Sequence, residues 1–146
     1  MKRLIYKAAV VGLLLSANCV TTSAQKTLRE CGFPIGIFDT GKNNAITDVK
    51  GVKVGQLTCI EGDSIRTGVT AIVPHSGNIF RNKVPAAIYI GNGFGKLAGY
   101  TQVKELGNIE TPVVLTNTLS VAAGIEGVVR YTLAQKGNEN VRSVNA

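Results

Sequence analysis

The chain has 146 residues, of which 45% are hydrophobic and 5% aromatic, and its formal net charge is +7. This length suffices for one domain with a buried core. The basic residues form no run of five and tryptophan is absent, so the sequence offers neither the basic patch nor the stacking aromatics of a nucleic-acid-binding surface. One histidine and no close pair of cysteines leave a structural zinc site without ligands, and no cofactor is expected.

Residues 1–24 have the three-part layout of a cleaved secretory signal peptide. The first seven residues carry three basic side chains, an apolar run covers residues 8–15, and small residues precede a cleavage point ahead of Gln25. The apolar run is much shorter than the about 20 residues that a membrane span needs. We therefore expect export to the periplasm of a bacterial cell or secretion from it, with no stable membrane span after cleavage.

Two other interpretations of this segment remain open, namely an uncleaved membrane anchor and a lipid attached to Cys19. Asn18 disfavours the lipid, because attachment prefers a glycine, alanine or serine at the position before the cysteine. Cleavage removes Lys2, Arg3 and Lys7 and thereby lowers the formal charge from +7 to +4. The remaining basic residues are scattered over the rest of the chain.

Two cysteines, Cys31 and Cys59, remain after cleavage. Export to an oxidising compartment permits a disulfide, whereas sequence separation says nothing about the geometry that a disulfide requires. A bridge between Cys31 and Cys59 and a pair of free or buried thiols are therefore both open.

Short strands and one long helix are expected after an irregular lead-in at residues 25–43, where glycine and proline interrupt every periodic pattern. The strands follow from alternating or continuous apolar runs between polar and glycine-rich segments. In chain order, strands are expected at 51–58, 68–74, 85–90 and 111–115, loops at 61–67 and 75–84, and one or two helical turns at 100–106. This order indicates an α/β or α+β layered fold.

The clearest expected element is a helix that begins at Asn117 or Thr118, one of which would cap it, and ends near residue 136. Its apolar residues recur with the spacing of one helix face, and they are Val121, Ile125, Val128, Val129, Thr132 and Leu133. Gly137 is expected in the left-handed conformation that ends helices.

Two glycines, Gly124 and Gly127, lie inside this helix. Each destabilises a helix by about 1 kcal/mol relative to alanine. Such a cost is tolerated where the helix backbone packs closely on a sheet or on another helix, which is the favoured interpretation.

His75 is the only imidazole, so a Ser-His-Asp arrangement would have to combine it with Ser76 or Ser120. Its surroundings do not resemble a nucleophile elbow, and an ordinary loop residue is the favoured interpretation. Glu105 and Glu110 lie close in sequence, and paired carboxylates can share acid–base work. Their expected places do not make them face each other, so solvated charges are favoured.

Residues 91–95 (GNGFG) form a glycine-rich segment after an expected strand. The spacing up to Lys96 matches neither a phosphate-binding loop nor a dinucleotide fingerprint. A tight turn, where the backbone approaches another chain or a ligand, is favoured. Asn117 lies between an expected strand and a helix, where its amide can bind a ligand or cap the helix.

Eight ordered sequence blocks lie within residues 44–146. They are NAITDVKGVKVG at 44–55, RTGVTAI at 66–72, PHSGN at 74–78, KVPAA at 83–87, NGFGK at 92–96, QVKELG at 102–107, IETP at 109–112 and LTNTLSV at 115–121. In this order they resemble the DmpA/BapA-type self-processing serine aminopeptidases, which include L-aminopeptidase/D-esterases and β-peptidyl aminopeptidases. One departure is Gln56, where the family pattern usually has a histidine.

The resemblance implies part of an α-β-β-α sandwich like that of N-terminal-nucleophile hydrolases, incomplete in this chain. Precursors of the family cut themselves into two subunits, and the new N-terminal serine acts as the nucleophile, with its own amine able to assist as base. Substrates are peptides, amides or esters with a free N-terminal amine, and the two-subunit units form homo-oligomers. The catalytic residues lie beyond residue 146 in the family pattern, so none is expected here, and Asn92 and Asn117 are the candidates for substrate binding.

The leading hypothesis is the N-terminal part of an exported aminopeptidase precursor, in which residues 44–146 are a truncated aminopeptidase domain. Such a chain is expected to be inactive alone and to need the C-terminal part of the same precursor as its partner. The second hypothesis is a non-catalytic exported half-domain that binds a peptide or a partner protein. A third is an independent hydrolase that uses His75.

Overall fold

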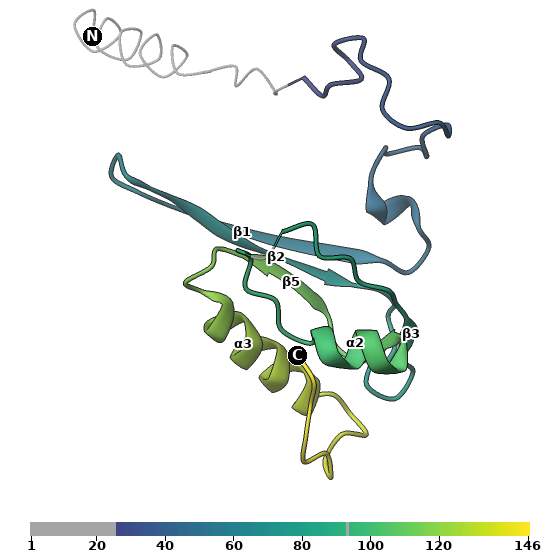
Figure 1. The fold of residues 1–146 in the computed structure, drawn as a ribbon, viewed down its shortest axis with the longest axis vertical. Helices are drawn as coiled ribbons and strands as arrows, with labels where there is room; N and C mark the ends of the chain where they lie inside the picture. Colours follow the sequence, from purple (N-terminus) through teal and green to yellow (C-terminus); the bar gives the residue numbers. More distant parts are fainter. Residues whose placement is uncertain (1–25, 93) are drawn as a thin grey trace, which may run out of the picture. The chain divides into compact units, whose positions relative to one another are not determined.

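The computed structural model describes residues 26–92 and 94–146 and divides the chain into two units, residues 1–39 and 40–146 (Figure 1). The predicted signal peptide, residues 1–24, lies outside the described residues. All the helices and strands of the described residues belong to the second unit.

In the first unit, the described residues 26–39 contain turns and bends and no helix or strand. The backbone N–H of Phe33 donates to the carbonyl of Leu28 over 3.0 Å. Glu30 accepts hydrogen bonds from the backbone N–H and the hydroxyl of Thr27, over 2.6 and 3.0 Å. The segment thus takes its local shape from hydrogen bonds between near neighbours in the sequence.

A three-stranded antiparallel sheet is the central element of the second unit (Figure 1). A short 3-10 turn, η2 (Ile46–Asp48), precedes it. β1 (Lys53–Glu61) and β2 (Ile65–Val73) form a hairpin, and β5 (Val113–Thr116) pairs with the other edge of β2, which gives the order β1–β2–β5. The sequence predicts all three strands, although their ends differ.

The β1–β2 hairpin is longer than the sequence predicts. β1 continues to Glu61 and β2 already begins at Ile65, so the predicted loop 61–67 shrinks to residues 62–64. The prediction is wrong because polar residues suggest a loop, whereas pairing of the two strands satisfies the backbone groups of this stretch. β5 pairs only with residues 69–72 of β2, so the outer half of the hairpin extends beyond the three-stranded region (Figure 1).

The predicted strand at 85–90 is wrong for most of its length. Only the short β3 (Val84–Pro85) forms, paired with β4 (Asn108–Ile109). The N–H of Ala86 then donates to the carbonyl of Gly107 over 2.8 Å. Within the described part of the chain, the residues that follow have no neighbouring strand, and an apolar run forms a strand only where another strand receives its hydrogen bonds.

α2 (Tyr100–Leu106) confirms the predicted helical turns. Two glycines in the left-handed region enclose it, Gly99 with φ 72° and Gly107 with φ 65°. The N–H of Gly107 donates to the carbonyl of Val103 over 2.9 Å and thereby ends the helix. Gly137, beyond the second helix, has φ 91° and confirms the left-handed conformation predicted for it.

α3 (Val121–Leu133) is the long helix that the sequence predicts, shorter at both ends. Ser120 precedes its first turn and makes no side-chain capping bond. The predicted cap at Asn117 or Thr118 is therefore wrong. Asn117 instead organises the turn in front of the helix, because its Oδ1 accepts hydrogen bonds from the backbone N–H groups of Leu119 and Ser120.

α3 packs on one face of the sheet, with Val128 buried at an exposed fraction of 7%. A Cβ atom added at Gly124 would lie 3.6 Å from Cγ1 of Val114 and 3.8 Å from Cγ2 of Thr116. This confirms the predicted close packing at Gly124. It does not hold for Gly127, where an added Cβ would meet no described atom within 4 Å.

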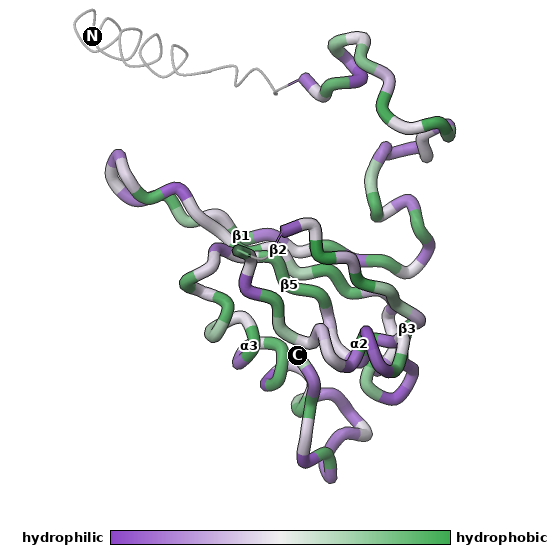
Figure 2. Tube along the Cα trace, viewed as in Figure 1, coloured by the Kyte–Doolittle hydropathy of each residue, from purple (hydrophilic) through white to green (hydrophobic). Residues whose placement is uncertain are grey.

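The opposite face of the sheet is apolar and largely uncovered, and we call it the open sheet face. Antiparallel partners share a face, which aligns Val54, Ile72 and Val113 there. Val54 is 36% exposed, Val113 40% and Leu115 56%. Figure 2 shows the hydrophobic colouring along β5 and the strands beside it. The second unit is thus a sheet with a helix on one face only.

Candidate functional site

An apolar cavity of about 450 Å³ lies among the β1–β2 hairpin, β5 and α3, and we call it the hairpin cavity. Leu57 and Val69 line it from the sheet, and Gly127 and Tyr131 line it from the helix. Its few polar groups include Asn117 at the junction between β5 and α3. An apolar cavity with few polar groups is the usual form of a small-molecule site.

Asn117, predicted to bind substrate, has most of its side-chain hydrogen-bonding groups engaged. Its Nδ2 donates to Oγ1 of Thr67 over 2.9 Å. Its Oδ1 accepts from the N–H groups of Leu119 and Ser120 over 3.1 and 3.0 Å. An amide nitrogen carries two donors, so one hydrogen of Asn117 is left for a ligand in the hairpin cavity.

Asn92, the other predicted substrate-binding residue, is exposed within the glycine-rich segment that follows residue 90. Its Oδ1 accepts a hydrogen bond from the N–H of Phe94 over 3.1 Å, which holds a short turn. Asn92 lines neither the hairpin cavity nor the second cavity described below. The structure therefore does not bring Asn92 and Asn117 into one site.

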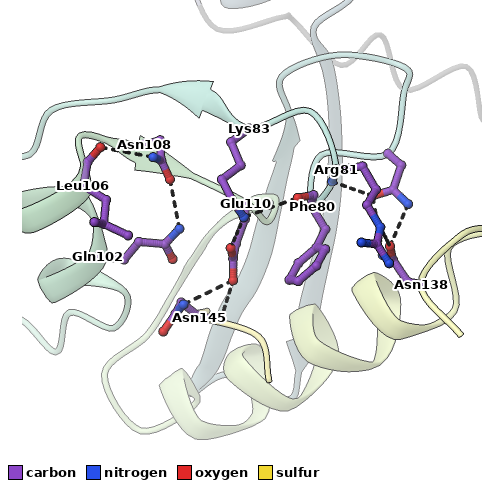
Figure 3. Close-up of polar contacts among 10 residues, drawn as sticks. Phe80, Arg81, Lys83, Gln102, Leu106, Asn108, Glu110, Asn138 and Asn145 are labelled. Carbon is purple, nitrogen blue, oxygen red and sulfur yellow. Dashed lines mark hydrogen bonds and ion pairs between the residues drawn. The ribbon is translucent and has the colours of Figure 1, made fainter. Parts of the chain in front are cut away.

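A second cavity, of about 330 Å³, lies among α2, β5, α3 and the last residues of the chain, and we call it the tail cavity. Gln102, Glu110 and Asn145 supply polar groups to its wall. Nε2 of Gln102 donates to Oδ1 of Asn108 over 3.0 Å (Figure 3). Gln102 thus links α2 to β4 beside the cavity.

Glu110 is buried at the tail cavity, with an exposed fraction of 5%, and holds the C-terminal segment (Figure 3). Its Oε1 accepts from the backbone N–H and the Nδ2 of Asn145 over 2.9 and 3.2 Å, and its Oε2 pairs with the ammonium of Lys83. Nζ of Lys83 also lies 4.6 Å from the centre of the Phe80 ring. The cluster joins three distant parts of the sequence.

The pKa of Glu110 lies below its ordinary value of 4.5. Burial by itself raises this pKa, but the N–H of Asn145 and the hydrogen bond and charge of Lys83 more than compensate. Glu110 is therefore a carboxylate at neutral pH and serves as the anchor of an ion pair.

Glu105 and Glu110, which the sequence suggests as a candidate acid–base pair, lie in different environments. Glu105 is exposed near the end of α2, as the interpretation of solvated charges requires. For Glu110 that interpretation is wrong, because the side chain is buried against Lys83 and Asn145. Lys83 and Asn145 lie far from Glu110 in sequence, so no spacing rule identifies the cluster.

A second polar cluster surrounds Asn138, whose exposed fraction is 1% (Figure 3). Its Nδ2 donates to the carbonyl of Thr132 over 2.7 Å, and its Oδ1 accepts from Nδ2 of Asn78 and Nε of Arg81 over 2.9 and 3.1 Å. Arg81 also donates to the carbonyl of Gly137. No sequence motif or periodicity points to this cluster, which ties the predicted loop 75–84 to the segment after α3.

His75 has both ring nitrogens engaged inside its loop. Its Nδ1 accepts a hydrogen bond from the N–H of Gly77 over 3.0 Å, so Nε2 carries the proton and donates to the carbonyl of Asn82 over 2.9 Å. No hydrogen bond among the described residues joins His75 to Ser76 or Ser120. The geometry favours a structural loop residue.

Cys31 and Cys59 are free thiols in the structure. Cys31 belongs to the first unit and Cys59 to β1 of the second, where its Sγ lies 3.8 Å from Oε1 of Glu61. The positions of the two units relative to each other are not determined, so the predicted bridge stays a prediction.

In the described part of the chain, no three histidine, cysteine, aspartate or glutamate side chains form a group able to hold a metal ion. The helices found there are all too short or too polar to traverse a lipid bilayer. No hydrogen bond in this part of the chain joins a serine hydroxyl to a histidine or a carboxylate, so the described residues contain no assembled serine nucleophile.

Residues 44–146 match the family model of Peptidase family S58. Among curated proteins, the β-peptidyl aminopeptidase BapA of Sphingosinicella microcystinivorans is 34% identical over 139 residues, which cover 90% of this chain and 34% of the relative. BapA of Sphingosinicella xenopeptidilytica is 32% identical over 138 residues, which cover 89% of this chain and 34% of the relative. The chain thus spans about a third of the length of the curated relatives it matches.

Three solved structures are similar to this one. The PH0078 protein of Pyrococcus horikoshii OT3 is 48% identical with a TM-score of 0.75, over 82% of this chain and 37% of that one. A β-aminopeptidase of a Burkholderia species is 40% identical with a TM-score of 0.65, over 70% of this chain and 30% of that one. The L-aminopeptidase D-Ala-esterase/amidase of Ochrobactrum anthropi is 30% identical with a TM-score of 0.68, over 82% and 35%.

The Ochrobactrum anthropi enzyme is described as a prototype of the serine aminopeptidases with a variant of the N-terminal-nucleophile hydrolase fold. The similarity confirms the fold class that the sequence predicts, an incomplete part of such an α/β sandwich. It also confirms the resemblance to the DmpA/BapA-type aminopeptidases, on which the sequence blocks and the curated relatives agree. This chain belongs to Peptidase family S58.

Proposed function

We propose that the chain is the N-terminal portion of an exported serine aminopeptidase precursor. The whole protein would remove N-terminal residues from peptides, amides or esters after cutting itself into two subunits. The observation that carries the proposal is the family match over residues 44–146, together with β-peptidyl aminopeptidase relatives of which the chain covers only 34%.

The chain alone is proposed to be inactive. A serine nucleophile needs a base within hydrogen-bond distance and donors for the oxyanion. His75, the one imidazole of the sequence, already uses both ring nitrogens within its loop. The nucleophile, its base and the oxyanion donors would therefore come from the C-terminal part of the precursor.

The open sheet face supports a need for that C-terminal part. Val54, Val113 and Leu115 remain substantially exposed on this face. A second sheet packed against it, as in a two-sheet sandwich, would bury the part of these side chains that is still exposed. The gain is a fraction of the about 1.5–3 kcal/mol that complete burial of such a side chain contributes. The C-terminal part is accordingly proposed as the partner that completes the fold.

Export is part of the proposal and rests on the sequence of residues 1–24. Mass spectrometry of the protein isolated from the periplasm or the medium is expected to give a chain that begins at Gln25. A mature protein that retains Met1, or that carries a lipid on Cys19, would contradict a cleaved signal peptide.

The hydrolytic function is tested with a panel of aminoacyl p-nitroanilides and two proteins. One is the chain from Gln25 to Ala146, and the other continues through the downstream codons of the gene. We expect only the longer protein to cut itself, as seen by mass spectrometry, and to release nitroaniline. Turnover by the short chain would overturn the proposed location of the catalytic residues.

A non-catalytic half-domain that binds a peptide or partner is the alternative. It predicts that neither protein cuts itself or turns over any substrate of the panel, while the short chain is monodisperse and stable. Of the two predicted substrate-binding residues, Asn117 is then the one to replace first, because it lines the hairpin cavity. Under the aminopeptidase proposal, Asn117→Ala in the longer protein should raise KM for a substrate with a free amine.

A further inference from the structure

β1 is an edge strand with one unpaired side. Among the described residues it pairs only with β2. Its other side presents a row of backbone N–H and C=O groups along nine residues. Such a row is a ready template for a further strand.

The edge of β1 lacks the features by which soluble proteins protect a free edge. Charged side chains, proline and bulges serve that purpose. Residues 54–60 (VGQLTCI) contain no charge and no proline, and their pairing with β2 continues without a bulge. Leu57 is 70% exposed and Ile60 63% exposed on the two faces of this strand. An edge of this kind is suited to be covered by another strand.

The two ends of β1 carry opposite charges, Lys53 at the start and Glu61 at the end. Neither side chain belongs to an ion pair among the described residues. An antiparallel neighbour with the same sequence would therefore place each lysine opposite a glutamate. The strand is complementary to itself in charge.

We propose that β1 pairs antiparallel with β1 of a second copy of the chain, about a two-fold axis at Leu57. The interface is isologous, since the same surface serves on both copies. The register aligns Lys53 with Glu61, Val54 with Ile60, Gly55 with Cys59, Gln56 with Thr58, and Leu57 with Leu57 of the second copy.

This pairing joins two three-stranded sheets into one sheet with β1 and its counterpart at the centre. Val54 and Ile60 lie on the open sheet face, where the register brings the two apolar side chains of different copies together. Leu57 points to the opposite face and lines the hairpin cavity, so the pairing places the two hairpin cavities side by side. The inference does not depend on the proposed aminopeptidase activity.

A charge-exchange series tests the register by sedimentation equilibrium at low salt. We expect the full chain to dimerise, and Lys53→Glu or Glu61→Lys to raise the dissociation constant by about tenfold, because each brings two pairs of like charges together. The double variant K53E/E61K restores opposite pairs and should return to the original dissociation constant. It also controls for folding, since it contains both substitutions.

A cross-linking experiment tests the axis. In a Cys19→Ser/Cys31→Ser/Cys59→Ser background, Leu57→Cys should form an intermolecular disulfide under mild oxidation, because directly opposed Cα atoms lie about 4.5–5.5 Å apart. Ile60→Cys is the matched control. Two copies of residue 60 would be six positions apart along the strands, or about 20 Å, and should not cross-link.

Each alternative occupant of the edge gives a distinct result. A strand supplied by the C-terminal part of the precursor predicts that the protein extended through the downstream codons of the gene stays monomeric and that its Leu57→Cys variant does not cross-link. A bound peptide predicts the same result for the chain in the presence of that peptide. Another dimer interface predicts a dissociation constant that is the same for all four proteins of the charge series. Any of these results overturns the proposal.

Discussion

Asn138 is 1% exposed and lies between α3 and the loop that follows β2, at the centre of a cluster of hydrogen bonds. Its amide donates to Thr132 and accepts from Asn78 and Arg81. Replacing it by alanine leaves the buried carbonyl of Thr132 and the part-buried groups of Asn78 and Arg81 without these hydrogen bonds, which we expect to lower the free energy of unfolding by about 3 kcal/mol. Urea denaturation checks the value.

Asn140→Ala is the matched control, because Asn140 is two residues further on and exposed. Its replacement should change the free energy of unfolding by less than about 0.5 kcal/mol. An Asn138→Ala variant as stable as this control would show that the cluster around Asn138 contributes nothing to stability.

Glu110 makes the stability of the fold depend on pH in the acid range. Its pKa is lowered in the folded state, so its stabilisation is fully present above the ordinary value of 4.5 and is lost as the pH falls through the lowered pKa. Glu110→Gln keeps the shape but removes the charge that Lys83 and Asn145 face. We expect the variant to be less stable at neutral pH by about 2 kcal/mol.

The diagnostic measurement is the free energy of unfolding of both proteins between neutral pH and about pH 3, a span set by the acid range of carboxylates. The difference in free energy of unfolding between the parent protein and the Glu110→Gln variant should narrow toward acid pH, where the carboxylate of Glu110 becomes protonated. Glu105→Gln, at an exposed site, is the matched control and should change the free energy of unfolding at neutral pH by less than about 0.5 kcal/mol. A gap of constant size would contradict the role given to the charge of Glu110.

At the scale of elements, the hairpin depends on a close approach of backbones at Gly68. A Cβ atom added there would lie 2.5 Å from the carbonyl oxygen of Leu57 and 3.3 Å from Cα of Thr58. Gly68→Ala must therefore push β1 and β2 apart, and we expect a loss of about 1–3 kcal/mol in urea denaturation. Gly55→Ala is the control on the neighbouring strand, because an added Cβ would meet no described atom within 4 Å.

The two glycines of α3 should respond in opposite ways. Gly127→Ala adds a methyl group in open space, so the gain in helix propensity should raise the free energy of unfolding by up to about 1 kcal/mol. Gly124→Leu inserts a large side chain where Cγ1 of Val114 is already 3.6 Å from the Cβ position, so this variant should have a lower free energy of unfolding. Equal destabilisation by both, in urea titrations, would show that Gly127 also packs closely.

At the scale of the whole molecule, the sequence predicts the elements whose signal is local. The apolar alternation of β1, the continuous apolar run of β2 and the helical face of α3 identify these elements. The predicted strand at 85–90 fails because its formation depends on a neighbouring strand, which composition does not reveal. The prediction of a loop at 61–67 is wrong for the converse reason. The polar residues at its two ends belong to β1 and β2, because each strand provides hydrogen-bonding partners for the other.

The polar clusters could not be predicted, because their members are distant in sequence. Lys83, Glu110 and Asn145 meet only when β3 pairs with β4 and the last residues of the chain pack beside them. Periodicity and motif spacing detect relations within one element, and no single element contains two of these residues. Asn117 could be found, since a strand–helix junction is a local feature, although its engagement with Thr67 required the structure.

The spacing of the strands along the chain also determines the order in which the sheet forms. The turn of the β1–β2 hairpin has three residues, so its pairing closes a short loop, on a time scale of about 1–10 μs for hairpins. β5 reaches β2 only after about 40 intervening residues, which makes its docking a non-local, slower step. In stopped-flow kinetics, Gly68→Ala should therefore slow refolding, whereas Gly124→Leu should mainly accelerate unfolding.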